Sequence, residues 1–241
     1  MTVLSIIIPC YNEELRLGLT LEEIAAYVSE RVGETEVIVV DDGSTDRTAE
    51  IARGSDCPGL SVLEVPENRG KGHAVRVGMM AARGDLRLFA DADGSTPIEE
   101  LAVLEKALDE IGGSGVSFAS IGIDGATVTR AQRGLRPAAG RLGNLLIRIV
   151  ALPGVLDSQR GFKLFSADAA HAIFSRATID RWAFDVEVLA VARHLGLRIV
   201  EVPVRWAHKD DSRVTALSYV STLLDVLRIR WRLIRGSYGQ A

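Results

Sequence analysis

Short β-branched runs alternate with segments of helical periodicity over the first ninety residues. Residues 3–8 and 36–40 have the pattern of buried strands, and residues 14–31 between them repeat leucine, isoleucine and valine at helical spacing. The same order then recurs, with helices predicted over 45–53 and 72–82 and strands over 60–65 and 86–90. This alternation predicts an α/β fold with a mostly parallel central sheet flanked by helices.

Polar clusters follow three of the predicted strands directly. They occupy residues 9–13, 41–46 and 91–97. Because the carboxyl ends of parallel strands meet at one edge of a sheet, ligands of such folds bind there. We therefore expect these three loops to form one crevice.

The pattern is weaker after residue 112, where glycine and basic residues accumulate. It predicts helices over 98–111, 141–152 and 167–174 and strands over 161–165 and 199–204. The last segment, 216–235, has an apolar stripe with late arginines, which is typical of a basic amphipathic helix, and packing against the core is the commoner use of such a stripe. We expect one domain over 1–241.

Composition narrows the class of protein. Hydrophobic residues make up 47% and charged residues 25%, as in ordinary globular proteins, and the net charge of −4 gives no basic field for nucleic acid. Two cysteines without a metal-type array, and an N-terminus without a signal-peptide pattern, favour a cytoplasmic location. The apolar stretch 145–156 is shorter than the roughly 20 residues that cross a bilayer.

Asp91 and Asp93 are the first candidates for chemistry. Alternate residues leaving a strand can direct two carboxylates at one ligand, and oxygen ligands suit Mg²⁺ or Mn²⁺. Such a metal would offset the charge of a departing nucleoside diphosphate. The same residues before Pro97 could instead cap a helix, and the pattern alone favours neither reading.

Two further loops have similar ambiguity. Asp42, in Asp41-Asp42-Gly43-Ser44, could accept hydrogen bonds from a base or ribose, with Tyr11 packing on the base, but it could equally belong to a turn or a helix cap. Gly70-Lys71-Gly72 would let backbone N–H groups and Lys71 approach a phosphate, although a glycine-rich turn needs no ligand.

The order of these motifs resembles that of inverting GT-A glycosyltransferases. Pro9-Cys10-Tyr11-Asn12-Glu13, Asp41-Asp42-Gly43-Ser44, Gly70-Lys71-Gly72 and Asp91-Ala92-Asp93-Gly94 come in the family's sequence. The segments 157–165 and 181–187 resemble dolichyl-phosphate β-glucosyltransferases and bacterial polyprenyl-phosphate sugar synthases. The resemblance covers nearly the whole chain and implies a single Rossmann-like GT-A domain that uses a nucleotide sugar.

The resemblance also implies roles for single residues. Pro9, Tyr11, Glu13 and Asp42 would hold the nucleoside, Lys71 would lie near the diphosphate, and Asp91 and Asp93 would bind the ribose-diphosphate and the metal. Arg160 and Lys163 would face the sugar and acceptor phosphates, with Arg130 and Arg133 as looser candidates. His208 is a candidate third metal ligand, although a lone surface histidine is the simpler reading.

Asp185 is the expected base or sugar-binding residue, with Glu187 as the alternative and a structural ion pair as the competing explanation for both. The expected reaction is inverting transfer of glucose from UDP-glucose to a polyprenyl phosphate. Alternatives are a soluble hydroxylated acceptor, GDP-mannose as donor, or a silent nucleotide-sugar binding protein. The C-terminal helix could touch the inner face of a membrane through its arginines and leucines, or form a homodimer.

Overall fold

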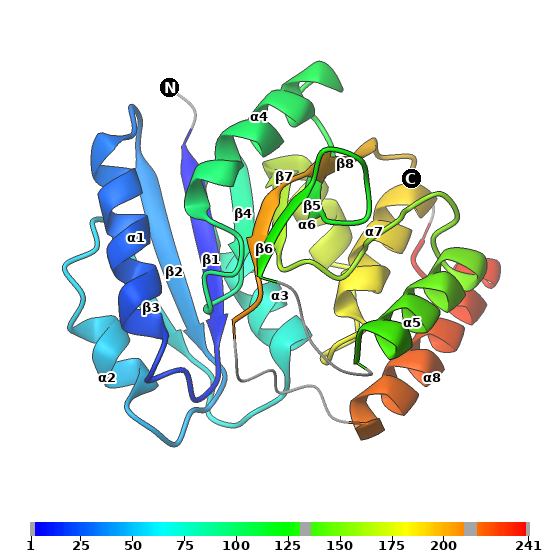
Figure 1. Ribbon diagram of the computed structural model, residues 1–241, viewed down its shortest axis with the longest axis horizontal. Helices are drawn as coiled ribbons and strands as arrows, with labels where there is room; N and C mark the ends of the chain where they lie inside the picture. Colours follow the sequence, from blue (N-terminus) through cyan, green and yellow to red (C-terminus); the bar gives the residue numbers. More distant parts are fainter. Residues whose placement is uncertain (1–2, 131–135, 210–215, 240–241) are drawn as a thin grey trace.

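A seven-stranded sheet forms the centre of the computed structural model, which describes residues 3–130, 136–209 and 216–239 (Figure 1). The strand order is β3-β2-β1-β4-β7-β5-β8. The bounds of these strands are β1 Leu4–Cys10, β2 Thr35–Asp41, β3 Leu60–Glu64, β4 Leu86–Ala90, β5 Val116–Ser120, β7 Phe162–Ser166 and β8 Ile199–Pro203.

The sheet is mostly parallel, as the alternation predicted. Strands β1 to β4 run the same way, and β5 pairs with β8 in parallel, whereas β7 is antiparallel to both β4 and β5. A separate two-stranded ribbon pairs β6 (Thr127–Arg130) with β9 (Arg205–Ala207). The predicted α/β architecture is confirmed.

Helices cover both faces of the sheet (Figure 1). Successive β1 side chains point to opposite faces, so Ile7 joins one buried cluster while Ile6 and Ile8 join the other. The first cluster lies under α3, α6 and α7, with α5 and α8 outside them, and the second under α1 and α4. The helix bounds are α1 Leu17–Glu30, α2 Thr48–Arg53, α3 Lys71–Ala81, α4 Leu101–Glu110, α5 Arg136–Val150, α6 Ala167–Phe174, α7 Phe184–His194 and α8 Ala216–Ile234.

Several elements differ from the pattern-based prediction. Helix α2 begins three residues later than predicted, because the side chain of Asp46 bonds the N–H of Thr48 and holds the preceding residues in a turn. Residues Ile98–Glu100 form a 3-10 turn before α4. Helix α7 and strands β5, β6 and β9 were not predicted; residues 184–192 of α7 are all buried, so this helix has no polar stripe to reveal its period.

Helix α8 contacts the protein through a different face from the one its leucines suggested. Val226 and Ile229 are buried, at 1% and 0% exposure, whereas Leu224 and Leu227 are 52% and 51% exposed. The expectation that the leucine stripe packs on the core is therefore wrong for this part of the helix, because Val226 and Ile229 occupy the inner face. Within the described ranges, no helix is both long and apolar enough to cross a membrane.

Candidate active site

The loops after β1 and β2 are joined by hydrogen bonds between side chains and backbone. The N–H of Asn12 donates to Ser44 Oγ at 2.8 Å, and Asn12 Oδ1 accepts from the N–H of Thr45 at 2.8 Å. The N–H of Glu13 donates to Thr48 Oγ1 at 2.7 Å. Asn12 has a φ of 53°, which places it in the left-handed region that asparagine tolerates. These bonds join two of the three loops that were predicted to form one crevice.

The predicted nucleoside-binding residues of the first loop lie at the end of β1 and directly after it. Pro9 is buried in β1, while Tyr11 is 36% exposed. Glu13 forms a 2.5 Å ion pair with Arg16. Their contact with a nucleoside stays a prediction.

Asp42 organises the glycine-rich turn before α3. Its side chain is buried, and its carboxylate accepts hydrogen bonds from the N–H of Gly70 at 2.6 Å and of Arg69 at 3.2 Å. Gly70 has a φ of 116°, and a Cβ there would lie 2.5 Å from the carbonyl oxygen of Asp180. This glycine therefore allows close packing, and its N–H donates to Asp42 rather than to a phosphate. The predicted approach of Lys71 to a phosphate stays a prediction.

Lys71 and Asp91 form an ion pair in the crevice, with Nζ 2.6 Å from Oδ1. The ammonium lies over the ring of Phe89 at 5.2 Å, with Trp182 and Phe184 each at 5.8 Å. Removal from solvent, together with the charges of Asp93 and Asp185, raises the pKa of Asp91 against the opposing effect of Lys71. Removal from solvent lowers the pKa of Lys71, but the nearby carboxylates outweigh it and the net shift is upward.

Gly161 closes the other side of Asp91. The N–H of Asp91 donates to the Gly161 carbonyl at 2.9 Å. A Cβ on Gly161 would lie 2.1 Å from Cγ and Oδ2 of Asp91 and 2.2 Å from its Oδ1. The antiparallel β4–β7 pairing brings these two segments together, so the glycine of Arg160-Gly161-Phe162-Lys163 makes room for the carboxylate.

Asp93 belongs to the turn after β4 and does not cap a helix. Its Oδ1 accepts from the N–H of Ser95 at 2.9 Å. The N-cap position of the following 3-10 turn is Pro97, without a side-chain cap, and the residue before α4 also has none. The helix-cap alternative for Asp91 and Asp93 is thereby excluded, and both side chains are partly exposed toward the crevice.

Lys163 and Asp185 form a buried ion pair beneath the site. Their side chains are 0% and 4% exposed, and Lys163 Nζ lies 2.5 Å from Asp185 Oδ1 and 2.5 Å from the Arg160 carbonyl oxygen. The expectation that Lys163 faces the phosphates is wrong, because its ammonium is enclosed by protein. The competing explanation of a structural ion pair fits Asp185, and its partner is Lys163.

Arg160, unlike Lys163, remains at the surface of the crevice. Its Nε donates to Asp157 at 2.7 Å, its guanidinium carbon lies 4.7 Å from the centre of the Trp206 ring, and its side chain is 26% exposed. The carboxylate and the indole fix the guanidinium plane. Sequence reasoning missed Asp157 and Trp206; the position of Asp157 three residues before Arg160 was the available signal.

Comparison with known proteins identifies the family. The model of "Glycosyl transferase family 2" matches residues 5–174. The chain belongs to this glycosyltransferase family. It is 38% identical to a dolichyl-phosphate β-glucosyltransferase of Drosophila melanogaster, over 98% of this chain and 76% of that one. It is 36% identical to the dolichyl-phosphate β-glucosyltransferase of Homo sapiens, over 98% and 77% of the two chains.

The fold of this family 2 glycosyltransferase is GT-A. Glucosyl-3-phosphoglycerate synthase of Mycobacterium tuberculosis, solved with Mn²⁺, UDP-glucose and phosphoglyceric acid, aligns with a TM-score of 0.70 and 24% identity over 94% of this chain and 80% of that one. Family and relatives together make the chain a hexosyltransferase.

The metal candidates of this family 2 chain are two carboxylates and one neighbouring histidine. In the ranges that the structure covers, no three His, Cys, Asp or Glu side chains are arranged as a ready metal site. His208 follows β9, whose Ala207 N–H donates to the Ser95 carbonyl at 2.9 Å, and its ring lies 5.9 Å from that of Trp206. Its role as a third ligand stays a prediction. Arg133 lies outside the described residues, and so does the side chain of Arg130.

Glu187 ties the C-terminal segment to the protein core. Its side chain is fully buried and accepts from the backbone N–H groups of Thr178 at 2.9 Å and Ile179 at 2.7 Å, and from the Tyr238 hydroxyl at 2.8 Å. Burial, together with the Glu187 charge, raises the pKa of Tyr238. These contacts make Glu187 an anchor for the chain end rather than a base.

Removing the Tyr238 hydroxyl gives a test of that anchor. We expect Tyr238→Phe to lower the free energy of unfolding by about 1–2 kcal/mol, since Glu187 keeps its backbone partners but loses one buried hydrogen bond. Urea unfolding measures this. Turnover should be unchanged, and a large loss of activity with unchanged stability would contradict the anchoring role.

Proposed function

We propose that this glycosyltransferase moves glucose from UDP-glucose to a polyprenyl phosphate of the dolichyl type, with inversion at the anomeric carbon and with Mg²⁺ or Mn²⁺. The relatives named above supply the sugar and acceptor class. The Mn²⁺ and UDP-glucose named with the mycobacterial structure support the donor and the metal.

The observation that carries the acceptor class is the burial of both expected bases. Asp185 is paired with Lys163, and Glu187 is saturated by backbone and tyrosine donors. A hydroxyl acceptor needs a carboxylate in reach of its proton, whereas a phosphate acceptor is already anionic and needs only cations to position it. Arg160 provides such a cation at the crevice, which supports the phosphate over the soluble hydroxyl.

The residues of the donor side fit a divalent cation bound together with a diphosphate. Mg²⁺-type ions commonly use one or two carboxylates and take their other ligands from phosphates and water, so Asp91 and Asp93 are a suitable donor set. When bound, the ion would neutralise the charge that develops on the leaving diphosphate.

The chain's own cations complete the arrangement. Lys71 lies 2.6 Å from Asp91 and can turn from it toward the diphosphate, while the rings of Phe89 and Trp182 limit its other directions. Arg160, held by Asp157 and Trp206, would receive the acceptor phosphate. The two cations would then hold both reacting partners for in-line attack on the anomeric carbon.

A donor and acceptor matrix tests the proposal. Purified protein with Mn²⁺ is incubated with UDP-glucose or GDP-mannose, and with polyprenyl phosphate, the matching polyprenol or no acceptor, while nucleoside diphosphate release is followed. We expect release only with UDP-glucose and polyprenyl phosphate. Release with polyprenol alone would overturn the acceptor class, release only from GDP-mannose would overturn the donor, and no acceptor-dependent release would overturn the transferase proposal.

The metal role of Asp93 has its own test. We expect Asp93→Ala to lower kcat/KM by about a hundredfold or more, because one of two carboxylate ligands is lost at the point where negative charge develops. Steady-state kinetics over a range of Mn²⁺ concentrations measure it. Asp109→Ala, at an exposed position of α4, is the control and should be unaffected. Full metal-dependent activity in Asp93→Ala would contradict the assignment.

A further inference from the structure

Large apolar side chains gather on the outer surface of two neighbouring helices. We call this surface the α5–α8 face; it consists of Leu145, Ile149, Leu223, Leu224, Leu227, Trp231 and Ile234, all between 39% and 71% exposed. Helices α5 and α8 lie side by side at the edge of the molecule (Figure 1). Soluble proteins rarely leave a contiguous apolar surface uncovered, so this one calls for a partner.

Arginines lie around this face. Arg228 is 68% exposed in its side chain, Arg230 is exposed, and the Arg235 guanidinium carbon lies 4.0 Å from the centre of the Trp231 ring. Asp225 is the single acidic residue of α8 and is paired with Arg228. The chain as a whole has a net charge of −4, so this positive edge is a local feature and complements an anionic surface.

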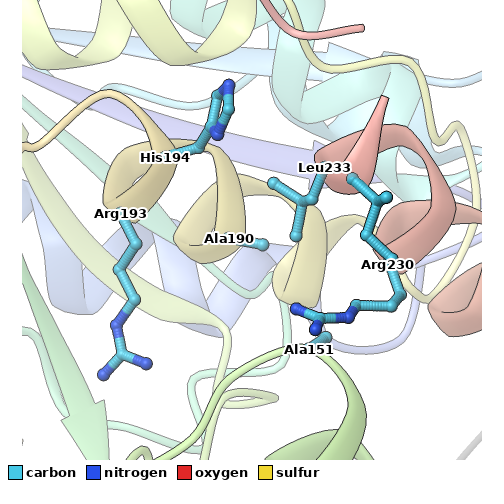
Figure 2. Close-up of a pocket in the computed structure, with 7 residues that line it drawn as sticks. Ala151, Ala190, Arg193, His194, Arg230 and Leu233 are labelled. Carbon is cyan, nitrogen blue, oxygen red and sulfur yellow. The ribbon is translucent and has the colours of Figure 1, made fainter. Parts of the chain in front are cut away.

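A basic pocket adjoins the end of the face. It has a volume of about 340 Å³, and side chains of α7 and α8 line it together with Ala151, which follows α5 (Figure 2). Arg193 and Arg230 supply guanidinium groups (Figure 2), and Arg193 Nη1 donates to the Pro153 carbonyl oxygen at 2.5 Å. Leu233 and Ile234 line the apolar side of the pocket. Guanidinium groups beside aliphatic side chains suit a phosphate attached to an acyl chain. Ile234 belongs to both the pocket and the α5–α8 face.

A lipid surface fits this face better than a second copy of the chain. In a twofold dimer through α8, the arginines of the two copies would come together, which costs free energy without acidic partners. At an anionic bilayer the same arginines meet lipid phosphates, and leucine with tryptophan can enter the interfacial layer.

We propose that the α5–α8 face docks on an anionic lipid surface and that the Arg193–Arg230 pocket takes the phosphate of a lipid headgroup. Figure 1 shows α8 beginning at the end of the molecule where β1 ends. The candidate site lies at that end too, because the loops after β1, β2 and β4 follow the carboxyl ends of parallel strands. Docking would thus bring the crevice to the bilayer. The docking stands on the face itself, and only its use, delivery of a lipid-phosphate acceptor, rests on the proposed function.

Vesicle binding tests the docking without acceptor or donor. The full chain is mixed with phosphatidylcholine vesicles that contain either phosphatidylglycerol or no anionic lipid, and the bound fraction is measured by sedimentation. We expect binding to the anionic vesicles that weakens with salt. The double variant Leu227→Glu/Trp231→Glu should bind at least about tenfold more weakly, because two interfacial side chains become charged. Equal binding of this variant would overturn the proposal.

Each substitution on the α5–α8 face or its pocket has a matched control on another surface, which shows whether the change in charge alone alters vesicle binding. Leu19→Glu changes a 67% exposed leucine on α1 and should leave binding unchanged. Arg230→Ala should weaken binding about fivefold through loss of one cation near the surface. Arg83 lies outside the α5–α8 face, and its side chain is 85% exposed. Arg83→Ala should not weaken vesicle binding. Equal losses in Arg230→Ala and Arg83→Ala would overturn the pocket's role.

Two further measurements separate the alternatives. Sedimentation velocity without lipid should show a monomer; a dimer abolished by Leu227→Glu/Trp231→Glu would assign the face to a second copy and overturn the lipid proposal. Turnover of that variant with detergent-solubilised polyprenyl phosphate should match that of the unmodified chain. Vesicle binding without any turnover would leave the docking intact and reject the proposed function, so the two failures are distinguishable.

Discussion

Replacing Gly161 with alanine is expected to lower kcat/KM by about a hundredfold or more, because a displacement of catalytic groups by about 1 Å has a cost of this size. The added Cβ would lie 2.1 Å from Cγ of Asp91, so the carboxylate must leave its position. The main chain at Gly161 has no positive φ, so alanine can adopt its conformation. The loss should therefore appear in turnover far more than in folding.

Gly143→Ala is the matched control for this substitution. Gly143 lies in α5, and a Cβ there meets no atom within 4 Å. Alanine in a helix interior is favoured over glycine by about 1 kcal/mol, so this variant should be as active as the unmodified chain and slightly more stable. Kinetics with Mn²⁺ and thermal unfolding of both variants measure the difference. Normal activity of Gly161→Ala would show that the Asp91 carboxylate is not needed where the structure holds it.

The donor side of the crevice was predictable from sequence because it consists of short local units. Each of the loops after β1, β2 and β4 follows its strand directly, and parallel strands bring such ends together regardless of what lies between them. The partly exposed pair Asp91 and Asp93 was therefore found from its position alone. Excluding the helix cap needed coordinates, since it depended on which N–H groups lie beside the carboxylates.

The acceptor side was less predictable because its contacts join segments distant in sequence. Nothing in Arg160-Gly161-Phe162-Lys163 indicates that one cation stays at the surface while the other is buried. Lys163 lies in β7, whose residues are all buried, and pairs with Asp185 of α7, whereas Arg160 precedes the strand. Trp206 reaches Arg160 only through the β6–β9 ribbon, whose short strands carry no periodic signal. The exposure of the α8 leucines was likewise unpredictable, because it depends on which face of α8 the neighbouring helices cover.

Breaking the buried pair of Lys163 and Asp185 is expected to have the largest effect on stability. Lys163→Met should lower the free energy of unfolding by about 3–5 kcal/mol, because it leaves a carboxylate enclosed by protein without its partner. The Arg160 carbonyl oxygen would also lose the ammonium that lies 2.5 Å from it. Urea unfolding monitored by circular dichroism measures the change.

The double variant Lys163→Met/Asp185→Asn separates the charge effect from the loss of packing. Neutralising Asp185 removes the uncompensated charge, so the double variant should recover more than half of the stability lost by Lys163→Met. If Asp185 were instead a catalytic base, Asp185→Asn in the double variant would abolish turnover whatever the stability. Under a phosphate acceptor, turnover should follow the folded fraction, since no proton has to be removed. A double variant that is less stable than Lys163→Met would contradict the pairing, and a stable but inactive one would return Asp185 to the catalytic machinery.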